Sequence, residues 1–362
     1  MSIEMNLEKF TFQGVSEERP LVIAGPCSAE SEEQVMETAR QLSDRGIKIF
    51  RTGIWKPRTR PNSFEGLGSV ALPWLQMVKD ELGMYTAVEV ANVKHVYEAL
   101  KFGVDILWIG ARTTANPFAV QEIADTLKGM NVPVMIKNPI NADVELWIGA
   151  IERMYNAGIT KLAVIHRGFS SFQDSIYRNH PQWQLPIEIR RRLPDIPIIT
   201  DPSHICGNRE NLFQVSQKAM DLNFDGLIIE SHIRPDKALS DAKQQITPEE
   251  LKQLLDKIII RKPEVENGLA LTLEELRVQI DKLDNEIMEI FEKRMKISDE
   301  IGTYKKKNNI AILQSKRWDE ILMRHVVNGE KKGLSEEFTK RIFYAIHQES
   351  INHQEQIMLN NE

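Results

Sequence analysis

The sequence predicts an α/β fold, a (β/α)8 TIM barrel, followed by an all-α helical domain that dimerises. Two observations lead to this prediction: eight short apolar runs lie within the first 232 residues, and a heptad pattern fills a last segment that has no proline. The runs are LVIAGPC (21–27), IKIFR (47–51), YTAVE (85–89), ILWIGAR (106–112), VPVMIK (132–137), KLAVIHR (161–167), PIITDPSH (197–204) and GLIIE (226–230). Such runs are typical of strands that are buried on both faces in a parallel sheet. The stretches between them are long enough for crossover helices, and chemistry in a barrel of this kind lies at the carboxyl ends of the strands.

Three of these runs end in residues that can bind a metal ion. Cys27, His204 and Glu230 close the first, seventh and eighth runs, which become neighbours once the barrel closes, and Asp241 follows in the next loop. A thiolate, an imidazole and two carboxylates suit a divalent transition ion such as Mn, Fe, Co or Zn. Taken alone, a cysteine after a strand is more often just a small buried side chain. The alternative ligands nearby are His232 and Asp201.

A second group of strand-end residues is cationic. Burying several like charges at one rim is costly unless anions pair with them, and guanidinium groups match phosphate and carboxylate in a bidentate manner. We therefore expect small phosphates or phosphorylated acids as substrates. The cations are Arg51, Lys56, Arg58, Arg112, Lys137 and Arg167.

The composition excludes several classes of partner. The chain has 362 residues, a net charge of −6 and a pI near 5.9, whereas a nucleic-acid-binding protein needs a basic face. No apolar run approaches the roughly 20 residues of a membrane span, and the amino terminus has no apolar core of a signal peptide. Only two cysteines occur, Cys27 and Cys206. We expect a cytoplasmic protein, with Cys206 as a small loop residue rather than a redox partner of Cys27.

Proline usage marks the domain boundary. All sixteen prolines lie at or before Pro263. We predict a barrel over residues 1–260, a linker over 261–271 and a helical domain over 272–362. Capping boxes at Thr247 and Thr272 would open the last barrel helix and the tail, respectively.

The tail should contain three helices. The first is long and ends near residue 307, and the other two cover about 315–328 and 335–358. Apolar residues recur in the first helix at spacings of three and four from Leu273 to Ile301, which is a heptad seam. A helix of that length cannot bury its seam on two shorter helices alone. We therefore expect a homodimer through this domain, or a higher homo-oligomer.

The seam is interrupted by Arg294. Lys305 lies three turns further on and shares its face. Cations inside a helical bundle with polar donors opposite describe a pocket for a dicarboxylate, although a polar seam residue can also simply set the register. The remaining members of the predicted pocket are Arg317, Ser350 and Gln354, with Arg277 placed to serve a partner's pocket.

The barrel motifs together resemble the 3-deoxy-D-arabino-heptulosonate 7-phosphate (DAHP) synthases, in particular the shorter type I subgroup. The resemblance covers about residues 20–255. It rests on AGPCS (24–28), KPRT (56–59) with SFEGLG (63–68), GARTT (110–114), KNP (137–139), HRG (166–168), DPSH (201–204) and IIESH (228–232). The sister family that makes the eight-carbon 3-deoxy-manno-octulosonate 8-phosphate normally has an Ala-Asn-Arg version of the second loop, so KPRT favours the seven-carbon product. With about 20 residues before the first strand, we expect no amino-terminal regulatory domain.

The resemblance implies a metal-dependent condensation of phosphoenolpyruvate with erythrose 4-phosphate. It implies that Cys27, His204, Glu230 and Asp241 hold the metal. Phosphoenolpyruvate would bind Arg51, Arg112, Lys137 and Arg167, and the aldose phosphate would bind Lys56, Arg58 and Thr59. The proton-transfer group stays open among Lys56, Glu89 and His166, and Glu89 could equally be a structural partner of a rim arginine.

The tail is similar to the all-helical chorismate mutases over residues 272–356. The resemblance implies that chorismate is enclosed by Arg294, Lys305, Arg317, Ser350 and Gln354, with Arg277 from the other protomer. Lys305 and Gln354 would donate to the ether oxygen whose charge develops during rearrangement to prephenate. Gln314 departs from the pattern, because many members have an acidic residue there.

Three interpretations follow. The first is a bifunctional enzyme of aromatic amino acid synthesis. The second is a DAHP synthase whose tail only dimerises and senses chorismate or prephenate. The third is an octulosonate synthase. Control of the barrel by prephenate is a hypothesis that rests on the fusion of the two domains.

Overall fold

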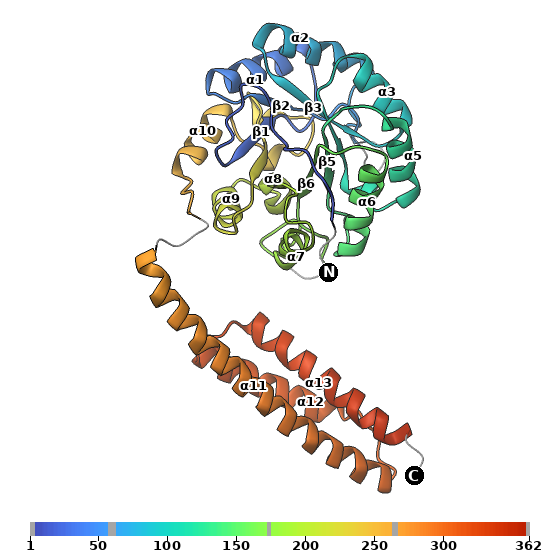
Figure 1. The fold of residues 1–362 in the computed structure, drawn as a ribbon, viewed down its shortest axis with the longest axis vertical. Coiled ribbons are helices and arrows are strands. Elements are labelled where there is room, and N and C mark those ends of the chain that lie inside the picture. The colour runs from blue at the N-terminus through green and yellow to red at the C-terminus, as the bar shows by residue number, and fades with distance from the viewer. Residues whose placement is uncertain (1–3, 57–62, 172–174, 263–266, 360–362) are drawn as a thin grey trace. The chain divides into compact units, whose positions relative to one another are not determined.

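The computed structural model describes residues 4–56, 63–171, 175–262 and 267–359. Contacts between residues divide the chain into two compact units, Met1–Pro263 and Glu264–Glu362. The first unit contains all the strands, and the second consists of helices (Figure 1).

The predicted barrel is confirmed. Eight parallel strands pair in sequence order, and β1 also pairs with β8, so that the sheet closes. This pairing places Gly25 opposite Glu230 and brings the first and last strands to one side of the rim. The strands are β1 (Leu21–Gly25), β2 (Ile49–Arg51), β3 (Tyr85–Val90), β4 (Ile106–Ile109), β5 (Val134–Lys137), β6 (Leu162–His166), β7 (Ile198–Thr200) and β8 (Gly226–Glu230).

Helices cover the outside of the barrel (Figure 1). The capping box predicted at Thr247 is present, with the Thr247 side chain accepting from the Glu250 amide and Glu250 accepting from the Thr247 amide. The helices are α1 (Glu32–Asp44), α2 (Leu72–Leu82), α3 (Val93–Lys101), α4 (Ala111–Thr114), α5 (Pro117–Leu127), α6 (Val144–Asn156), α7 (Gln184–Arg192), α8 (Pro202–Cys206), α9 (Leu212–Asp221) and α10 (Pro248–Lys257), with short 3-10 turns η1 (Gly68–Ala71), η2 (Pro235–Lys237) and η3 (Ala242–Gln244).

Side chains alternate between two cores along each strand. On β6, Ala163 and Ile165 belong to the core inside the barrel, whereas Leu162 and Val164 belong to the core between the strands and the helices. Both cores are apolar, as expected for a parallel barrel that is covered on both faces. The same alternation decides which strand-end residues point into the barrel mouth.

The second unit contains α11 (Asn267–Lys307), α12 (Ser315–Lys331) and α13 (Glu336–Leu359), close to the three predicted helices. The predicted start at Thr272 is wrong, because α11 already begins at Asn267. Leu269, Ala270 and Leu271 are strong helix formers. They extend the helix upstream, and Thr272 then lies within it, where a residue cannot serve as an N-cap.

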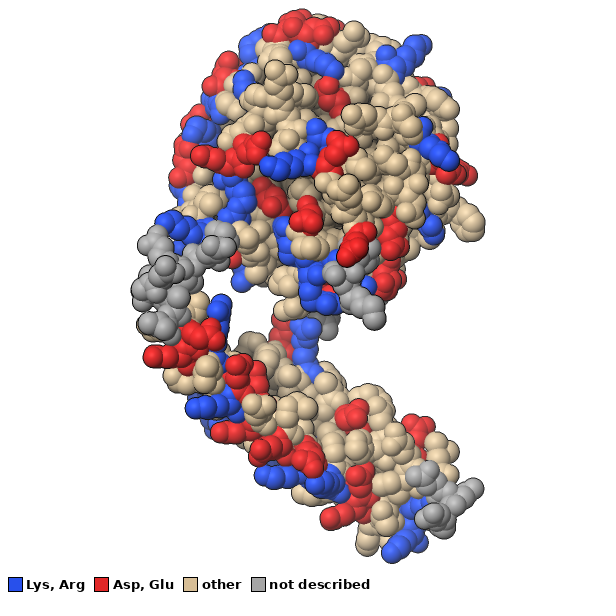
Figure 2. All heavy atoms as spheres, in the orientation of Figure 1, with Lys and Arg blue, Asp and Glu red and all other residues tan. Residues whose placement is uncertain are grey.

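On the face shown in Figure 2, neither unit has a large region of charge of one sign. Acidic and basic side chains are intermixed over the face shown in Figure 2. None of the helices in the described ranges combines the length and the apolar character that crossing a membrane would require.

Candidate active sites

The strand alternation points four charged side chains into the barrel mouth. Arg51 follows the inward Ile49, Lys137 the inward Met135, Glu89 the inward Ala87 and Glu230 the inward Ile228. Arg51, Lys137 and Glu230 are at most 4% exposed. Charged side chains are buried to this extent only where partners compensate them.

Two buried ion pairs provide that compensation. The Arg51 guanidinium lies 2.9 Å from the Glu230 carboxylate, and Lys137 Nζ lies 2.9 Å from Asp201. In the described part of the chain, the buried Nε of Arg51 has no hydrogen-bond partner. An unused guanidinium donor in a cationic cavity is suited to an anionic ligand.

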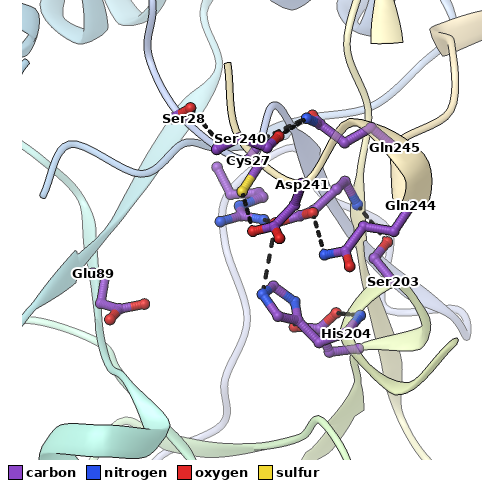
Figure 3. Close-up of polar contacts among 12 residues, drawn as sticks. Cys27, Ser28, Glu89, Ser203, His204, Ser240, Asp241, Gln244 and Gln245 are labelled. Carbon is purple, nitrogen blue, oxygen red and sulfur yellow. Dashed lines mark hydrogen bonds and ion pairs between the residues drawn. The ribbon is translucent and has the colours of Figure 1, made fainter. Parts of the chain in front are cut away.

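Three of the predicted metal ligands, Cys27, His204 and Asp241, lie together in Figure 3, and the fourth, Glu230, lies beside His204. Cys27 Sγ contacts Asp241 Oδ2 at 3.2 Å, and His204 Nε2 lies 3.8 Å from Glu230 Oε1. The other imidazole nitrogen, Nδ1, lies 2.8 Å from Asp201 Oδ2. A carboxylate on the far nitrogen is how proteins orient a histidine for metal binding, so these residues fit a divalent ion. Among the described residues, no group of three such side chains is already spaced to hold one.

Amide side chains fix the carboxylates and the cysteine. The Gln244 amide donates to Glu230 Oε2 at 2.7 Å, and the Gln245 carbonyl accepts from the Cys27 amide at 2.9 Å. Arg178 donates to both Asp241 and Gln244 at 2.9 Å. The turn η3 therefore positions one side of the site, as Figure 3 shows.

Burial and neighbouring charges set the protonation of this cluster. Burial raises the pKa of the Cys27 thiol to about 12, and Glu230 adds to the rise. Burial also lowers the pKa of His204, which keeps its imidazole neutral and able to offer a lone pair. Burial alone would lower the pKa of Lys56, but the hydrogen-bonded Cys27 sulfur and the Glu230 carboxylate outweigh it and raise that pKa. Lys56 Nζ lies 2.9 Å from Cys27 Sγ.

The remaining predicted cations differ in burial. Arg167 is half-buried and donates to Asn179 at 2.8 Å, and burial lowers its pKa to about 10. Arg112 is exposed on α4. Arg58 and Thr59 lie outside the described residues.

A tryptophan inside the barrel links three of the inward residues. The Trp108 indole Nε1 donates to Glu89 Oε2 at 2.9 Å. The Arg51 guanidinium lies 5.0 Å and Lys137 Nζ 5.8 Å from the centre of a Trp108 ring, which is within the range of cation–π attraction. In the sequence, Trp108 is indistinguishable from an ordinary core residue of β4, so this role was not predicted.

The structure does not support His166 as a proton-transfer residue. It follows the outward Val164, is fully buried, and contacts the Pro181 carbonyl at 2.6 Å and the Trp183 ring at 5.0 Å. Burial lowers its pKa to about 4. The expectation fails because the adjacent residues 166 and 167 point to opposite faces of the strand.

Three further candidates contact residues outside the proposed metal-ligand cluster: Glu89, His232 and Cys206. Glu89 accepts from Trp108 and lies apart from Cys27, Asp241 and His204 in Figure 3. His232 Nε2 faces Glu30 at 3.5 Å. Both cysteines are free thiols, and Cys206 belongs to the outer core.

In the helical unit, two of the predicted cations meet polar partners across helices. Arg294 on α11 donates to the Ser350 hydroxyl on α13. Lys305 Nζ donates to Gln354 Oε1 at 3.0 Å, and the Gln354 amide donates to Ser298 at 3.2 Å. Four of the residues predicted for the pocket are therefore adjacent.

The other two cations do not join this group in a single chain. Arg277 lies near Glu274 and Arg317 near Glu320, each at 3.4–3.5 Å on its own helix. Both arginines are more than half exposed. Gln314 is the N-cap residue of α12 and makes no side-chain capping bond.

The fold and the rim define the first unit as a (β/α)8 barrel whose mouth holds buried cations paired with carboxylates. Residues 5–265 match the sequence model of the DAHP synthetase I family, and residues 276–355 match chorismate mutase type II. The chain belongs to the DAHP synthetase I family. It is an enzyme that combines a 3-deoxy-7-phosphoheptulonate synthase (transferase) domain with a chorismate mutase (isomerase) domain.

Individual relatives cover about two thirds of this chain and carry both the heptonate and the octonate names. The phospho-2-dehydro-3-deoxyheptonate aldolase of Thermotoga maritima is 36% identical over 237 residues, which cover 66% of this chain and 68% of the relative. The 2-dehydro-3-deoxyphosphooctonate aldolase of Geobacter sulfurreducens is 29% identical over 262 residues, covering 67% and 92%.

Solved structures are similar as well. The crystal structure of the Thermotoga maritima DAHP synthase superposes with a TM-score of 0.60 at 36% identity, covering 65% of this chain and 67% of that one. A truncated form of the Thermotoga maritima enzyme gives 0.58 at 33% identity, covering 65% and 84%.

Proposed function

We propose that the barrel condenses phosphoenolpyruvate with erythrose 4-phosphate to give DAHP and phosphate. The observation that carries this proposal is the pairing of buried, inward cations with a sulfur, imidazole and carboxylate set at one rim. The two groups share Glu230, which contacts Arg51 and approaches His204. Anion binding and electrophile activation therefore lie side by side.

The cations would bind phosphoenolpyruvate. Arg51 offers its unused Nε, and Lys137 at the end of β5 and Arg167 just after β6 would add further cations. Arg112 would complete the set from α4. The Arg51 guanidinium is held by Glu230 and by the Trp108 face, and a fixed orientation reduces the ordering cost of binding.

Cys27, His204, Glu230 and Asp241 would hold a divalent ion of the Mn, Fe, Co or Zn type. When bound there, such an ion polarises the aldehyde oxygen and makes the carbonyl carbon a better electrophile. Lys56, Arg58 and Thr59 would take the aldose phosphate. Lys56 is the proton-transfer candidate that remains at the site, because its Nζ reaches the Cys27 sulfur.

We propose further that the helical domain rearranges chorismate to prephenate. Arg294 and Ser350 would bind a carboxylate, and Lys305 and Gln354 would donate to the ether oxygen as negative charge develops on it. The reaction needs no covalent step, so orientation and fixed donors can supply the catalysis. A second candidate function is a tail that binds chorismate or prephenate only as a sensor.

Dimerisation through α11 is part of this proposal. Its seam is exposed in a single chain: Leu276, Ile280 and Ile287 are 52%, 58% and 46% exposed. A contiguous apolar stripe of this kind marks an interface. Arg277 lies on the same exposed half of α11 and would reach a partner's pocket. Feedback by prephenate and a cytoplasmic location complete the proposal.

One purified sample tests both activities. Phosphoenolpyruvate consumption with erythrose 4-phosphate and prephenate formation from chorismate should both be observed. A chelator should abolish the first and leave the second intact; equal loss of both would refute the metal assignment. Preference for a five-carbon aldose phosphate would favour octulosonate synthesis. Chorismate binding without turnover would favour the sensor, and a synthase rate unaffected by prephenate would refute feedback.

A further inference from the structure

A stacked ring pair joins α12 to α13 beside the helical pocket. The Trp318 and His347 rings have centroids 3.9 Å apart and an interplanar angle of 23°. Tyr344 packs on the same tryptophan at 5.6 Å. Trp318 directly follows Arg317 in sequence, so this stack ties the start of α12 to α13.

His347 lies on the pocket side of α13. It precedes Ser350 by three residues and Gln354 by seven, so the three share one helical face. Ser350 and Gln354 are the partners of Arg294 and Lys305. His347 thus extends the row of polar groups by one turn.

The charges around His347 agree with this placement. Burial lowers the pKa of the imidazole, and the neighbouring charges of Arg294 and Lys305 on α11 lower it further. From α12 the ring meets Trp318, which also packs against Tyr344 of α13. The imidazole is therefore neutral at pH 7 within a cationic group.

We propose that His347, supported by Trp318, is a ligand-contacting residue of the helical pocket and hydrogen-bonds a carboxylate or hydroxyl group of the bound dianion. This inference rests on the proposed mutase function and extends it to a residue outside the predicted set. A neutral imidazole has one donor and one acceptor nitrogen, and the tryptophan face fixes its plane. The acceptor nitrogen of His347 can bind a ligand hydroxyl, for which Gln314 offers only an uncharged acceptor in place of the usual carboxylate.

The proposal carries a pH signature. A dianion beside His347 offsets the charges of Arg294 and Lys305 and stabilises the imidazolium, so binding should raise the pKa of His347. By linkage, binding then takes up a proton, and ligand affinity is higher at low pH and falls as pH rises through the pKa of the complex. A rise of about one pKa unit corresponds to a tenfold change in Kd.

The chain supplies a matched control. His325 on α12 stacks on Phe343 of α13 at 3.9 Å and 15°, and burial, Arg324 and Arg294 lower its pKa, so this histidine also feels the charge of Arg294 but stacks on a different ring. His347→Gln removes the stacked ring, whereas His347→Phe keeps a ring on Trp318 and removes only the nitrogens. His325→Gln removes the other stack.

The experiment uses the full chain and prephenate, which is the product and does not turn over. Calorimetry from pH 5.5 to 8 gives Kd, and NMR of labelled histidines gives each pKa with and without prephenate. We expect His347→Gln and His347→Phe to weaken binding about tenfold and to flatten its pH dependence. His325→Gln should behave like the wild type.

Several outcomes would overturn the proposal. One is a His347→Phe variant that binds prephenate with wild-type affinity and pH dependence, which would make the stack purely structural. Another is a His347 pKa that prephenate does not raise. If the wild type neither binds prephenate nor converts chorismate, the proposed mutase function itself fails, and the inference fails with it.

Discussion

The barrel rim and the helical pocket both collect cations, but they compensate them differently. At the rim, Arg51 and Lys137 are buried and paired with carboxylates. In the helical unit, Arg294 and Lys305 are half-buried. Among their described hydrogen bonds to oxygen, Arg294 donates to a hydroxyl, and Lys305 donates to a side-chain amide and a backbone carbonyl. The rim cations are balanced by carboxylates, whereas the cations of the helical unit have no such partner among these bonds, as the proposed binding of a dianion would require. Mutations can test this difference.

Removing a rim carboxylate should have the largest effect. Glu230→Ala leaves the Arg51 charge buried and uncompensated, so we expect the free energy of unfolding of the barrel to fall by about 3–5 kcal/mol. Synthase activity should be lost, while chorismate conversion is retained. Urea denaturation, monitored by tryptophan fluorescence, measures the change in the free energy of unfolding.

The exposed ion pair of Arg45 and Glu249 provides the control. Its carboxylate is 58% exposed, so Glu249→Ala should change the free energy of unfolding far less than Glu230→Ala. If both substitutions had equal effects, the rim pair would not be the buried, mutually dependent pair described above.

Removing a pocket cation should affect rate far more than stability. Arg294→Ala removes a cation that has no carboxylate partner among the described contacts, so no buried carboxylate is stranded. We expect mutase kcat/KM to fall on the order of 100-fold, as for loss of one preorganised donor. The exposed Arg341, which pairs with Glu337 on its own helix, is the control. Full mutase activity in Arg294→Ala would refute the pocket.

Apolar periodicity was sufficient to predict the elements but not every side-chain direction. The eight runs predict eight strands because hydrophobic burial dominates both cores of the barrel. Burial of both faces also removes the alternation of polar and apolar residues from which side-chain direction is assigned. In KLAVIHR both faces are apolar, so the run does not reveal that His166 points outward and Arg167 inward.

Contacts between distant segments could not be predicted from the sequence either. The Lys137–Asp201 pair joins β5 to the residue after β7, and the Trp318–His347 stack joins two helices. Each depends on the curvature of a barrel or the crossing of helices, which residue spacing does not specify. The cysteine, histidine and carboxylate set was predictable because closure alone makes the first, seventh and eighth strands neighbours.

The outward, neutral His166 should make the barrel sensitive to acid. Its pKa is about 4 in the folded state and near 6.5 when unfolded. Below pH 6.5 the unfolded chain gains a proton that the folded chain does not, so stability falls with decreasing pH until pH 4. The loss is about 1.4 kcal/mol per pH unit in that window. Unfolding of wild type and His166→Phe at pH 7, 5.5 and 4.5 tests this; parallel pH profiles would contradict it.

The smallest effect is expected at Trp108, which supports the rim without carrying charge. Trp108→Phe keeps an aromatic face under Arg51 and Lys137 but removes the donor to Glu89. The loss of this hydrogen bond should lower the free energy of unfolding by about 1–3 kcal/mol. Because the cations lose orientation, KM for phosphoenolpyruvate should rise several-fold, while KM for the aldose phosphate stays near wild type.

Trp147→Phe separates this effect from ordinary destabilisation. Trp147 is also fully buried, and its Nε1 donates to the Ile136 carbonyl at 3.1 Å in the outer core. Its loss should lower stability by a similar amount and leave both KM values unchanged. If Trp147→Phe raised KM for phosphoenolpyruvate as much as Trp108→Phe does, the rim cations would respond to the general stability of the barrel rather than to the indole beneath them.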